Sequence, residues 1–391
     1  MRAMRRGAAP LMSAMALVAA AAAPGAAAGS AGESLPVVVQ TLADDAPCRP
    51  ASGKRAGQAP WTQDMLGLDR VWRMTRGQGV TVAVVGTGVG TTIPALAGRV
   101  TPAGAKDGQD CVGHGSFVAG LIAAAPREGS GFTGVAPAAR ILAVRATTQR
   151  GATTAATVAR GIEAAVGGGA KVIAVPYAFA GRSARLTAAV ARARRADALV
   201  VAPAVPDQPP RQAAADAAQP QDYWPAAEPG VLSVVDFGAD GSRPPNAAVP
   251  RHADLGAPGD RVVSVGPGGE GAFTGSGSSL AVGFAAGAAA LVRSYEPGID
   301  ADRTRTRLLG GSYTATMPRL DPYAAVSGVM PADSAAAMEQ AGPVTLPVVA
   351  PDSGARSRSM LIATGGVSLV LLVGALGWLV PRARARGWRA G

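Results

Sequence analysis

The chain has few histidines and cysteines, the residues that most often bind zinc. It contains only two histidines, His114 and His252, and two cysteines, Cys48 and Cys111. No CxxC spacing occurs, so a zinc site would need all four of these scattered residues. Aromatic residues make up only 4% of the chain, and no arginine cluster in its body is interleaved with them. This excludes the basic and aromatic surface typical of nucleic-acid-binding proteins. We therefore expect no metal, no cofactor and no nucleic-acid partner.

The net charge of +11 is concentrated at the two ends of the chain. Three arginines near the N-terminus precede an apolar run at 8–23 and a small-residue stretch at 26–29. This pattern predicts a secretory signal peptide over residues 1–28, with a buried N-terminal helix as the alternative. Without the seven arginines of the two ends the remaining charge is about +4, an ordinary value for a solvated surface.

Residues 360–380 form an apolar run without a charged residue. At about 1.5 Å per residue, this run is long enough to cross a hydrocarbon core of about 30 Å. Four arginines lie in the tail at 381–391, against two shortly before the run, so the tail should be cytoplasmic. The sequence thus predicts a single-pass protein of the cytoplasmic membrane whose main domain lies outside. A buried core helix is the alternative.

Between these ends, Val- and Ile-rich runs alternate with Ala-rich stretches of helical length. Continuous apolar strands separated by helices predict an α/β fold, with a parallel sheet covered by helices on both faces. The expected strands are 80–85, 141–146, 171–177 and 198–204, and helices should begin near residues 116, 153, 183 and 279. Residues 60–328 would form this domain, after a wrapped extension at 29–59 and before a Pro/Ala-rich linker at 329–359. Ligands of such folds bind at the carboxyl ends of the strands.

Two motifs in the expected domain contain candidate catalytic residues. Residues 113–120 read GHGSFVAG, and residues 273–291 read FTGSGSSLAVGFAAGAAAL. Both resemble motifs of the subtilisin-like serine proteases, in which acid, histidine and serine follow one another along the chain. Further segments at 60–85, 133–146 and 254–265 are similar to the family in order and spacing. With the signal, the linker, the single span and the basic tail, the chain resembles the mycosins, which are membrane-anchored subtilases associated with type VII secretion systems.

The resemblance assigns Ser279 as the nucleophile and His114 as its general base. A serine at the start of a helix gains from the partial positive charge there. Such a serine can also be a simple N-cap, a role that Ser276 or Ser278 would serve equally. His114 could likewise be a structural histidine at a helix N-terminus. In an exported chain Cys48 and Cys111 are expected to form a disulfide, which would hold the extension beside His114. Its loop adds roughly 4 kcal/mol on the chain-entropy model.

The acid of the triad is missing. The family has Asp-Thr-Gly or Asp-Ser-Gly where this chain has Gly86 and its next two residues, and no Asp or Glu occurs from 70 to 106. Loss of this carboxylate costs about 10⁴ in turnover in serine proteases. Asp107 and Asp110 are the candidate substitutes.

The oxyanion side of the site also departs from the family. Pro206 aligns with the family's oxyanion asparagine, and proline has no side-chain donor. The chain's one asparagine, Asn246, lies far along the sequence, and Gln208 is the nearest amide. Loss of one such donor costs about 10²–10³ in subtilisin.

These departures predict a mycosin-like subtilase with impaired or absent proteolysis. The resemblance implies a structural or regulatory role, with the type VII secretion membrane complex as its partner. The rival hypothesis is an active endopeptidase in which Ser279 and His114 work with a substitute acid on a peptide or protein substrate. A third possibility is a cleft that binds an extended peptide without cutting it.

Overall fold

The computed structural model describes residues 34–207, 220–245 and 247–328, together with nine positions between 366 and 386. Residues 1–330 and 331–391 are separate compact units. The predicted signal peptide at 1–28, the linker at 329–359 and most of the predicted span at 360–380 lie outside the described residues. Within the described part of the chain, no helix combines the length and the apolar character needed to cross a bilayer.

The first unit is built on a seven-stranded sheet in which all strands are parallel, in the order β2-β3-β1-β4-β5-β6-β7. The strands are β1 (Thr81–Gly86), β2 (Val100–Pro102), β3 (Arg140–Arg145), β4 (Val172–Ala174), β5 (Leu199–Pro203), β6 (Leu232–Phe237) and β7 (Leu255–Pro258). The predicted α/β class is confirmed, and β1, β3, β4 and β5 fall on the four expected apolar runs.

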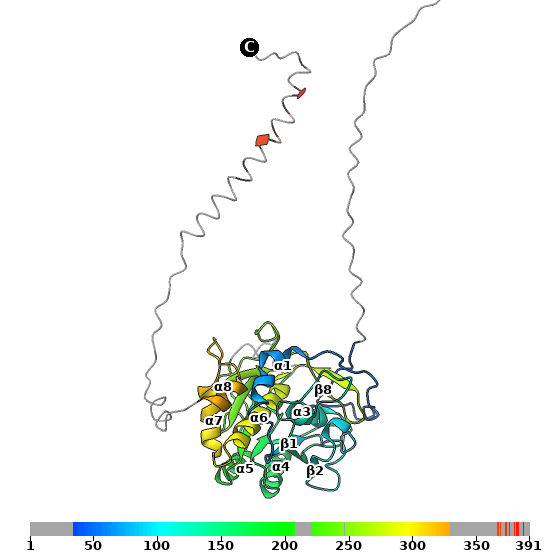
Figure 1. The fold of residues 1–391 in the computed structure, drawn as a ribbon, viewed down its shortest axis with the longest axis vertical. Helices are drawn as coiled ribbons and strands as arrows, with labels where there is room; N and C mark the ends of the chain where they lie inside the picture. The colour runs from blue at the N-terminus through cyan, green and yellow to red at the C-terminus, as the bar shows by residue number, and fades with distance from the viewer. Residues whose placement is uncertain are drawn as a thin grey trace, which may run out of the picture. The chain divides into compact units, whose positions relative to one another are not determined.

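Helices cover both faces of this sheet. Successive side chains of a strand point to opposite faces, and the strands carry apolar residues on both, so each face needs a covering layer. On β1, Val82 and Val84 join the core beneath α3 (His114–Ala123) and α6 (Ser278–Tyr295). The alternate residues Ala83 and Val85 join a second core with α4 (Ala155–Gly167) and α5 (Ala184–Arg195). In Figure 1, α4 and α5 lie at the lower edge of the domain. Every β1 residue except Thr81 is buried, which explains why the strand has no polar alternation.

The remaining elements are short and surround this framework. They are α1 (Trp61–Met65), α2 (Leu68–Val71), the 3₁₀ turn η1 (Pro94–Leu96), the antiparallel pair β8 (Val262–Val265) and β9 (Ala272–Gly275), α7 (Ala301–Gly310) and α8 (Pro322–Ser327).

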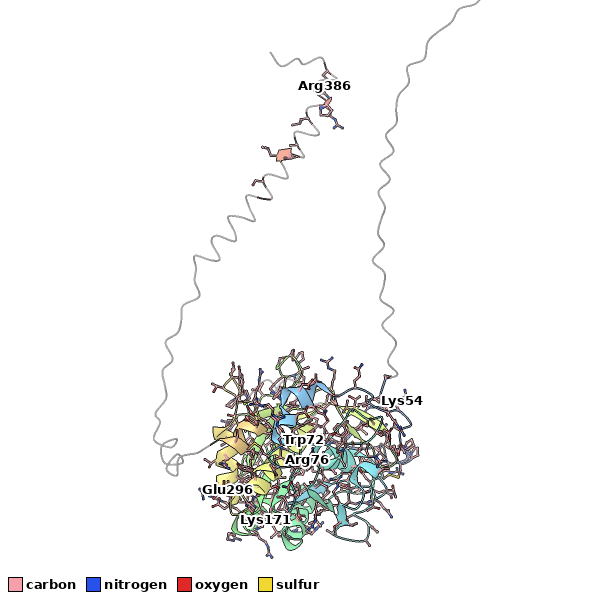
Figure 2. All side chains as sticks on the ribbon, in the orientation of Figure 1. Lys54, Trp72, Arg76, Lys171, Glu296 and Arg386 are labelled. Carbon is pink, nitrogen blue, oxygen red and sulfur yellow. A yellow bond between two sulfur atoms is a disulfide. The ribbon has the colours of Figure 1, made fainter. Side chains whose placement is uncertain are left out.

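After α2, the Arg76 guanidinium lies 5.9 Å from the Trp72 ring centre, and both are labelled in Figure 2. At the amino edge of the sheet, Lys171 pairs with Asp197 at 2.9 Å. Lys171 appears at the bottom of Figure 2.

Helix α6 is the centre of the domain, because every residue from Ser278 to Arg293 is buried. A helix enclosed on all sides needs apolar residues all round and small ones where neighbours approach. A Cβ on Gly283 would lie 2.9 Å from Leu121 Cβ in α3, which is closer than carbon atoms normally pack. Gly283 therefore sets the spacing of α3 and α6.

The described part of the predicted extension, residues 34–59, bonds to the domain at several points. The Val38 amide donates to the Thr274 carbonyl at 2.8 Å, and the Thr274 amide donates to Pro36 at 2.9 Å. The predicted disulfide between Cys48 and Cys111 is confirmed. Next to it, the Arg49 amide donates to the Cys111 carbonyl at 2.8 Å. The extension is thus held to the segment that leads into α3.

Replacement of both Cys48 and Cys111 by serine should lower the free energy of unfolding by up to about 4 kcal/mol, because the bond closes a separation of 63 residues. Limited proteolysis of the double variant should cut within residues 34–59 first. Reduced native protein is the control and should behave in the same way. An unchanged denaturation midpoint in both would contradict this role.

Gly283→Ala should destabilise the domain. Overpacking against Leu121 costs about 1–3 kcal/mol, whereas the gain in helix propensity is about 1 kcal/mol. Gly167→Ala at the end of α4 is the matched control, since a Cβ there meets nothing within 4 Å. Denaturation midpoints should fall for Gly283→Ala and stay level or rise for Gly167→Ala. Equal midpoints would show that the α3–α6 spacing is not limiting.

Candidate functional site

The structure brings His114 and Ser279 together although 165 residues separate them. His114 Nε2 lies 3.0 Å from Ser279 Oγ, and each residue is only 1% exposed. His114 begins α3 and Ser279 lies in the first turn of α6, so the close packing of the two helices places both at the carboxyl edge of the sheet. This distance allows a histidine to accept a proton from a serine hydroxyl.

Glycines start both helices and leave the serine free for this contact. Gly113 and Gly277 are the N-caps of α3 and α6, with φ of 94° and 147°. A Cβ at Gly277 would lie 2.2 Å from Asp207 Cγ, so only glycine fits there. Ser279 is therefore not an N-cap, and that interpretation is wrong. Ser276 hydrogen-bonds to Asp260, and Ser278 to Asp236.

Gly86 ends β1 beside the first turn of α3. Its neighbour Thr87 accepts a hydrogen bond from the Gly115 amide through Oγ1 at 2.8 Å. A Cβ at Gly86 would lie 3.6 Å from Gly115 Cα, an ordinary contact. Among the described residues His114 Nδ1 has no hydrogen-bond partner, and burial lowers the pKa of His114 to about 4. The imidazole is thus neutral at neutral pH, without a carboxylate to orient it or to stabilise its protonated form.

Neither candidate substitute acid hydrogen-bonds to His114. Asp110 is buried, and its carboxylate accepts from the amides of Val112 at 3.1 Å, Gly113 at 2.7 Å and Ser116 at 2.8 Å. Asp110 therefore satisfies the free N–H groups at the start of α3. Asp107 is only half-buried, and burial raises its pKa.

Asp207 is the residue that the sequence comparison missed. Its Oδ1 accepts the Ser279 amide at 2.8 Å, and its Oδ2 accepts the Ser279 hydroxyl at 2.6 Å. The side chain that faces the nucleophile position is therefore that of Asp207, one residue after Pro206. A one-residue shift after β5 would have found it, because Asp207 is the first side chain there with hydrogen-bonding oxygens. Gln208 and Asn246 lie outside the described residues.

The surroundings of Asp207 favour its neutral form. Burial raises the pKa of its carboxyl to about 6, against the opposing hydrogen bonds from Ser279, and the nearby Asp236 raises it further. Asp236 is itself buried on β6, where Ser278 Oγ donates to it at 2.5 Å and Arg243 pairs with it at 3.3 Å. The buried Tyr177 has a raised pKa, caused first by burial and then by Asp110 and Asp207. Asp207 thus bonds to Ser279 while Asp236 bonds to the neighbouring Ser278.

A cavity of about 610 Å³ opens at this place. Residues 37–41 of the extension line it together with His114, Asp207, Ser276 and Leu280. The site therefore lies at the carboxyl ends of the strands, where ligands of such folds bind. His252 is exposed and pairs with Asp254 at 3.1 Å in a different cavity. Within the described ranges no three His, Cys, Asp or Glu side chains gather as metal ligands.

Comparison with known proteins agrees with this geometry. The subtilase family (Peptidase_S8) matches residues 77–321. Mycosin-3 of Mycobacterium tuberculosis is 30% identical over 83% of this chain and 84% of its own length. The solved structure of the MycP3 protease from the type VII (ESX-3) secretion system has a TM-score of 0.63 and 28% identity, and the match covers 75% of this chain and 96% of that one.

A chain in the structure of the periplasmic assembly from the ESX-5 inner membrane complex also has a TM-score of 0.63, at 25% identity over 81% of this chain and 96% of its own. The family match spans more than half of the sequence and the likeness to Mycosin-3 most of it. The chain therefore belongs to the subtilase family and is a subtilase of the mycosin type.

Proposed function

We propose that this chain is a membrane-anchored, extracytoplasmic component of a type VII secretion complex, with a structural or regulatory role and severely impaired proteolysis. The observation that carries the impairment is the carboxylate of Asp207 on the Ser279 amide and hydroxyl, together with the absence of a carboxylate at Gly86. The association is supported by the likeness to Mycosin-3 and by the similar chain in the structure of the periplasmic assembly from the ESX-5 inner membrane complex.

The two departures affect two different charges that form in the same step of acyl transfer, one on the histidine and one on the carbonyl oxygen. Without an acid at Gly86, no carboxylate among the described residues holds His114 Nδ1 or stabilises the protonated imidazole, at a cost of about 10⁴. At Ser279, a carboxylate takes the place where a donor would stabilise the oxyanion, and loss of that donor alone costs about 10²–10³. If the two losses multiply even in part, the rate falls by a factor of roughly 10⁵ or more.

The topology of the proposal rests on the two ends of the sequence. Residues 1–28 would direct export, and residues 360–380 would anchor the protein with the tail at 381–391 in the cytoplasm. The folded domain would then face the extracytoplasmic side. Its intact core, its disulfide and its ordered extension offer a stable surface for partners, whether or not Ser279 reacts.

A strain that carries Ser279→Ala in place of the native gene should assemble the complex and secrete its substrates at native levels, because the proposed role does not use the hydroxyl. Deletion of the gene should abolish both. Secreted protein in the medium and the size of the solubilised complex are the measurements. A secretion defect in Ser279→Ala as severe as that of the deletion would overturn the proposal.

Gly86→Asp alone should raise the rate of Ser279 labelling by a fluorophosphonate at neutral pH less than tenfold, because the Asp207 carboxylate still occupies the place of the oxyanion. Gly86→Asp combined with Asp207→Asn should raise it by about 10² or more, since both the acid and the donor return. Ser279→Ala in the same background is the control. A large gain from Gly86→Asp alone would show that Asp207 is no obstacle.

A further inference from the structure

The geometry points to a further activity of this site: an acid-dependent acyl transfer in which protonated Asp207 becomes the hydrogen-bond donor to the oxyanion. The inference uses the proposed role of Ser279 as nucleophile, and it adds a condition under which the impaired site works. In the ionised state Asp207 blocks the site, and in the neutral state it completes the site.

The block follows from the single proton of the Ser279 hydroxyl. That proton can be donated to only one acceptor, and Asp207 Oδ2 at 2.6 Å competes with His114 Nε2 at 3.0 Å. A hydrogen bond to an ionised carboxylate is roughly twice as strong as one between neutral groups. While Asp207 is charged, the serine therefore donates to the carboxylate, and His114 cannot act as its base.

The carboxylate also occupies the place where negative charge would develop. Its Oδ1 is bonded to the Ser279 amide, which is the backbone donor available to an oxyanion at the start of α6. A second negative charge at this buried place would be repelled. The other hydroxyl of this turn is no substitute, since Ser278 donates to Asp236.

Protonation of Asp207 reverses both effects. The neutral carboxyl accepts hydrogen bonds more weakly, so it releases the serine hydroxyl to His114 and the Ser279 amide to a ligand. It also gains an O–H donor directed at the same place. Buried carboxylic acids that stay neutral act as oxyanion donors in other enzymes.

The chemical step then balances with an amide or ester and water as its only reactants. Ser279 Oγ forms a bond to the carbonyl carbon of an amide or ester, its proton passes to His114 Nε2, and the carbonyl oxygen takes the negative charge. The Ser279 amide and the Asp207 O–H hold that oxygen. The bond to the leaving group breaks as His114 returns the proton to it, and water repeats the sequence to release the acid and restore the serine.

The groups around Asp207 define the pH window. They are Ser279 on α6, His114 on α3, Tyr177 after β4, and Asp236 on β6 with its partner Arg243. The described extension contributes only residues 37–41 to the cavity, and these carry no titratable side chain. Asp207 has a pKa raised to about 6 and His114 one lowered to about 4. Between these values the carboxyl is neutral and the imidazole is still unprotonated.

The test is the rate at which a fluorophosphonate labels the full-length chain in detergent, at about pH 7.5 and about pH 5. In this reaction Ser279 Oγ displaces fluoride from phosphorus, and the phosphoryl oxygen takes the place of the oxyanion. With a pKa of about 6, the neutral fraction of Asp207 rises from about 3% to about 90%, so the rate should rise about 30-fold. A site limited only by its histidine would show no rise on acidification, because His114 with a pKa of about 4 is still largely unprotonated at about pH 5.

Two variants assign the effect to this side chain. Asp207→Asn carries an amide donor at both pH values, so it should label at about pH 7.5 nearly as fast as the native chain does at about pH 5, without a further rise. Asp207→Ala has neither charge nor donor and should label slowly at both. Ser279→Ala gives the background. The native profile needs no variant, so it tests the inference even if a replacement disturbs folding.

The outcomes separate this inference from the proposed function. Slow native labelling at both pH values, with no gain in Asp207→Asn, would overturn the inference and leave the impaired site in place. Rapid native labelling at about pH 7.5 without a rise on acidification would overturn both. Slow labelling at about pH 7.5 with the acid rise, absent in Asp207→Asn, is the result we expect.

Discussion

The close approach of α3 and α6 is the contact on which this molecule depends. Gly283 lets Leu121 pack directly against the buried central helix, and the starts of the two helices then meet at the carboxyl edge of the sheet. His114 and Ser279 come within 3.0 Å as a consequence of this packing, without an acid to draw the histidine into place. The chain thus combines the histidine and serine contact of a serine peptidase with a glycine at position 86.

The Asp207 contact has opposite consequences for stability and for catalysis. A carboxylate on the first amides of a helix is stabilising, by about 0.3–1 kcal/mol at exposed sites and up to about 2 kcal/mol where partly buried. It satisfies the Ser279 amide and fits against Gly277, where no side chain has room. The same negative charge opposes the one that acyl transfer would create. A folded domain whose nucleophile is held in this way suits a role in assembly, and it leaves the reaction dependent on one proton.

Much of the framework could be predicted because its signals are local. Continuous apolar runs identified β1, β3, β4 and β5, and the glycine-flanked histidine and serine identified the starts of α3 and α6. The two cysteines were correctly paired because a chain that is predicted to be exported and has only two of them offers few alternatives. The missing carboxylate at Gly86 could also be predicted, since no acidic residue occurs nearby along the sequence.

The electrostatics of the site could not be predicted from the sequence, because they depend on where the folded chain places each acidic side chain. The path of the chain after β5 decides whether Pro206 or Asp207 faces Ser279. The two choices differ by one residue in register, and the sequence alone does not determine that register. The roles of Asp110 and Asp236 are similar cases. One satisfies the amides of α3 and the other takes the hydroxyl of Ser278, and both bonds join residues whose side-chain directions only the folded chain defines.

The most direct test of this account is the pH dependence of the Ser279 backbone amide proton, followed by NMR in the native chain and in Asp207→Asn. A hydrogen bond to a charged carboxylate shifts an amide proton strongly, so the native signal should titrate with a midpoint near pH 6. The titration should vanish in Asp207→Asn. An amide signal that stays constant between about pH 5 and about pH 8, or one that titrates equally in the variant, would contradict the placement of Asp207 on the nucleophile.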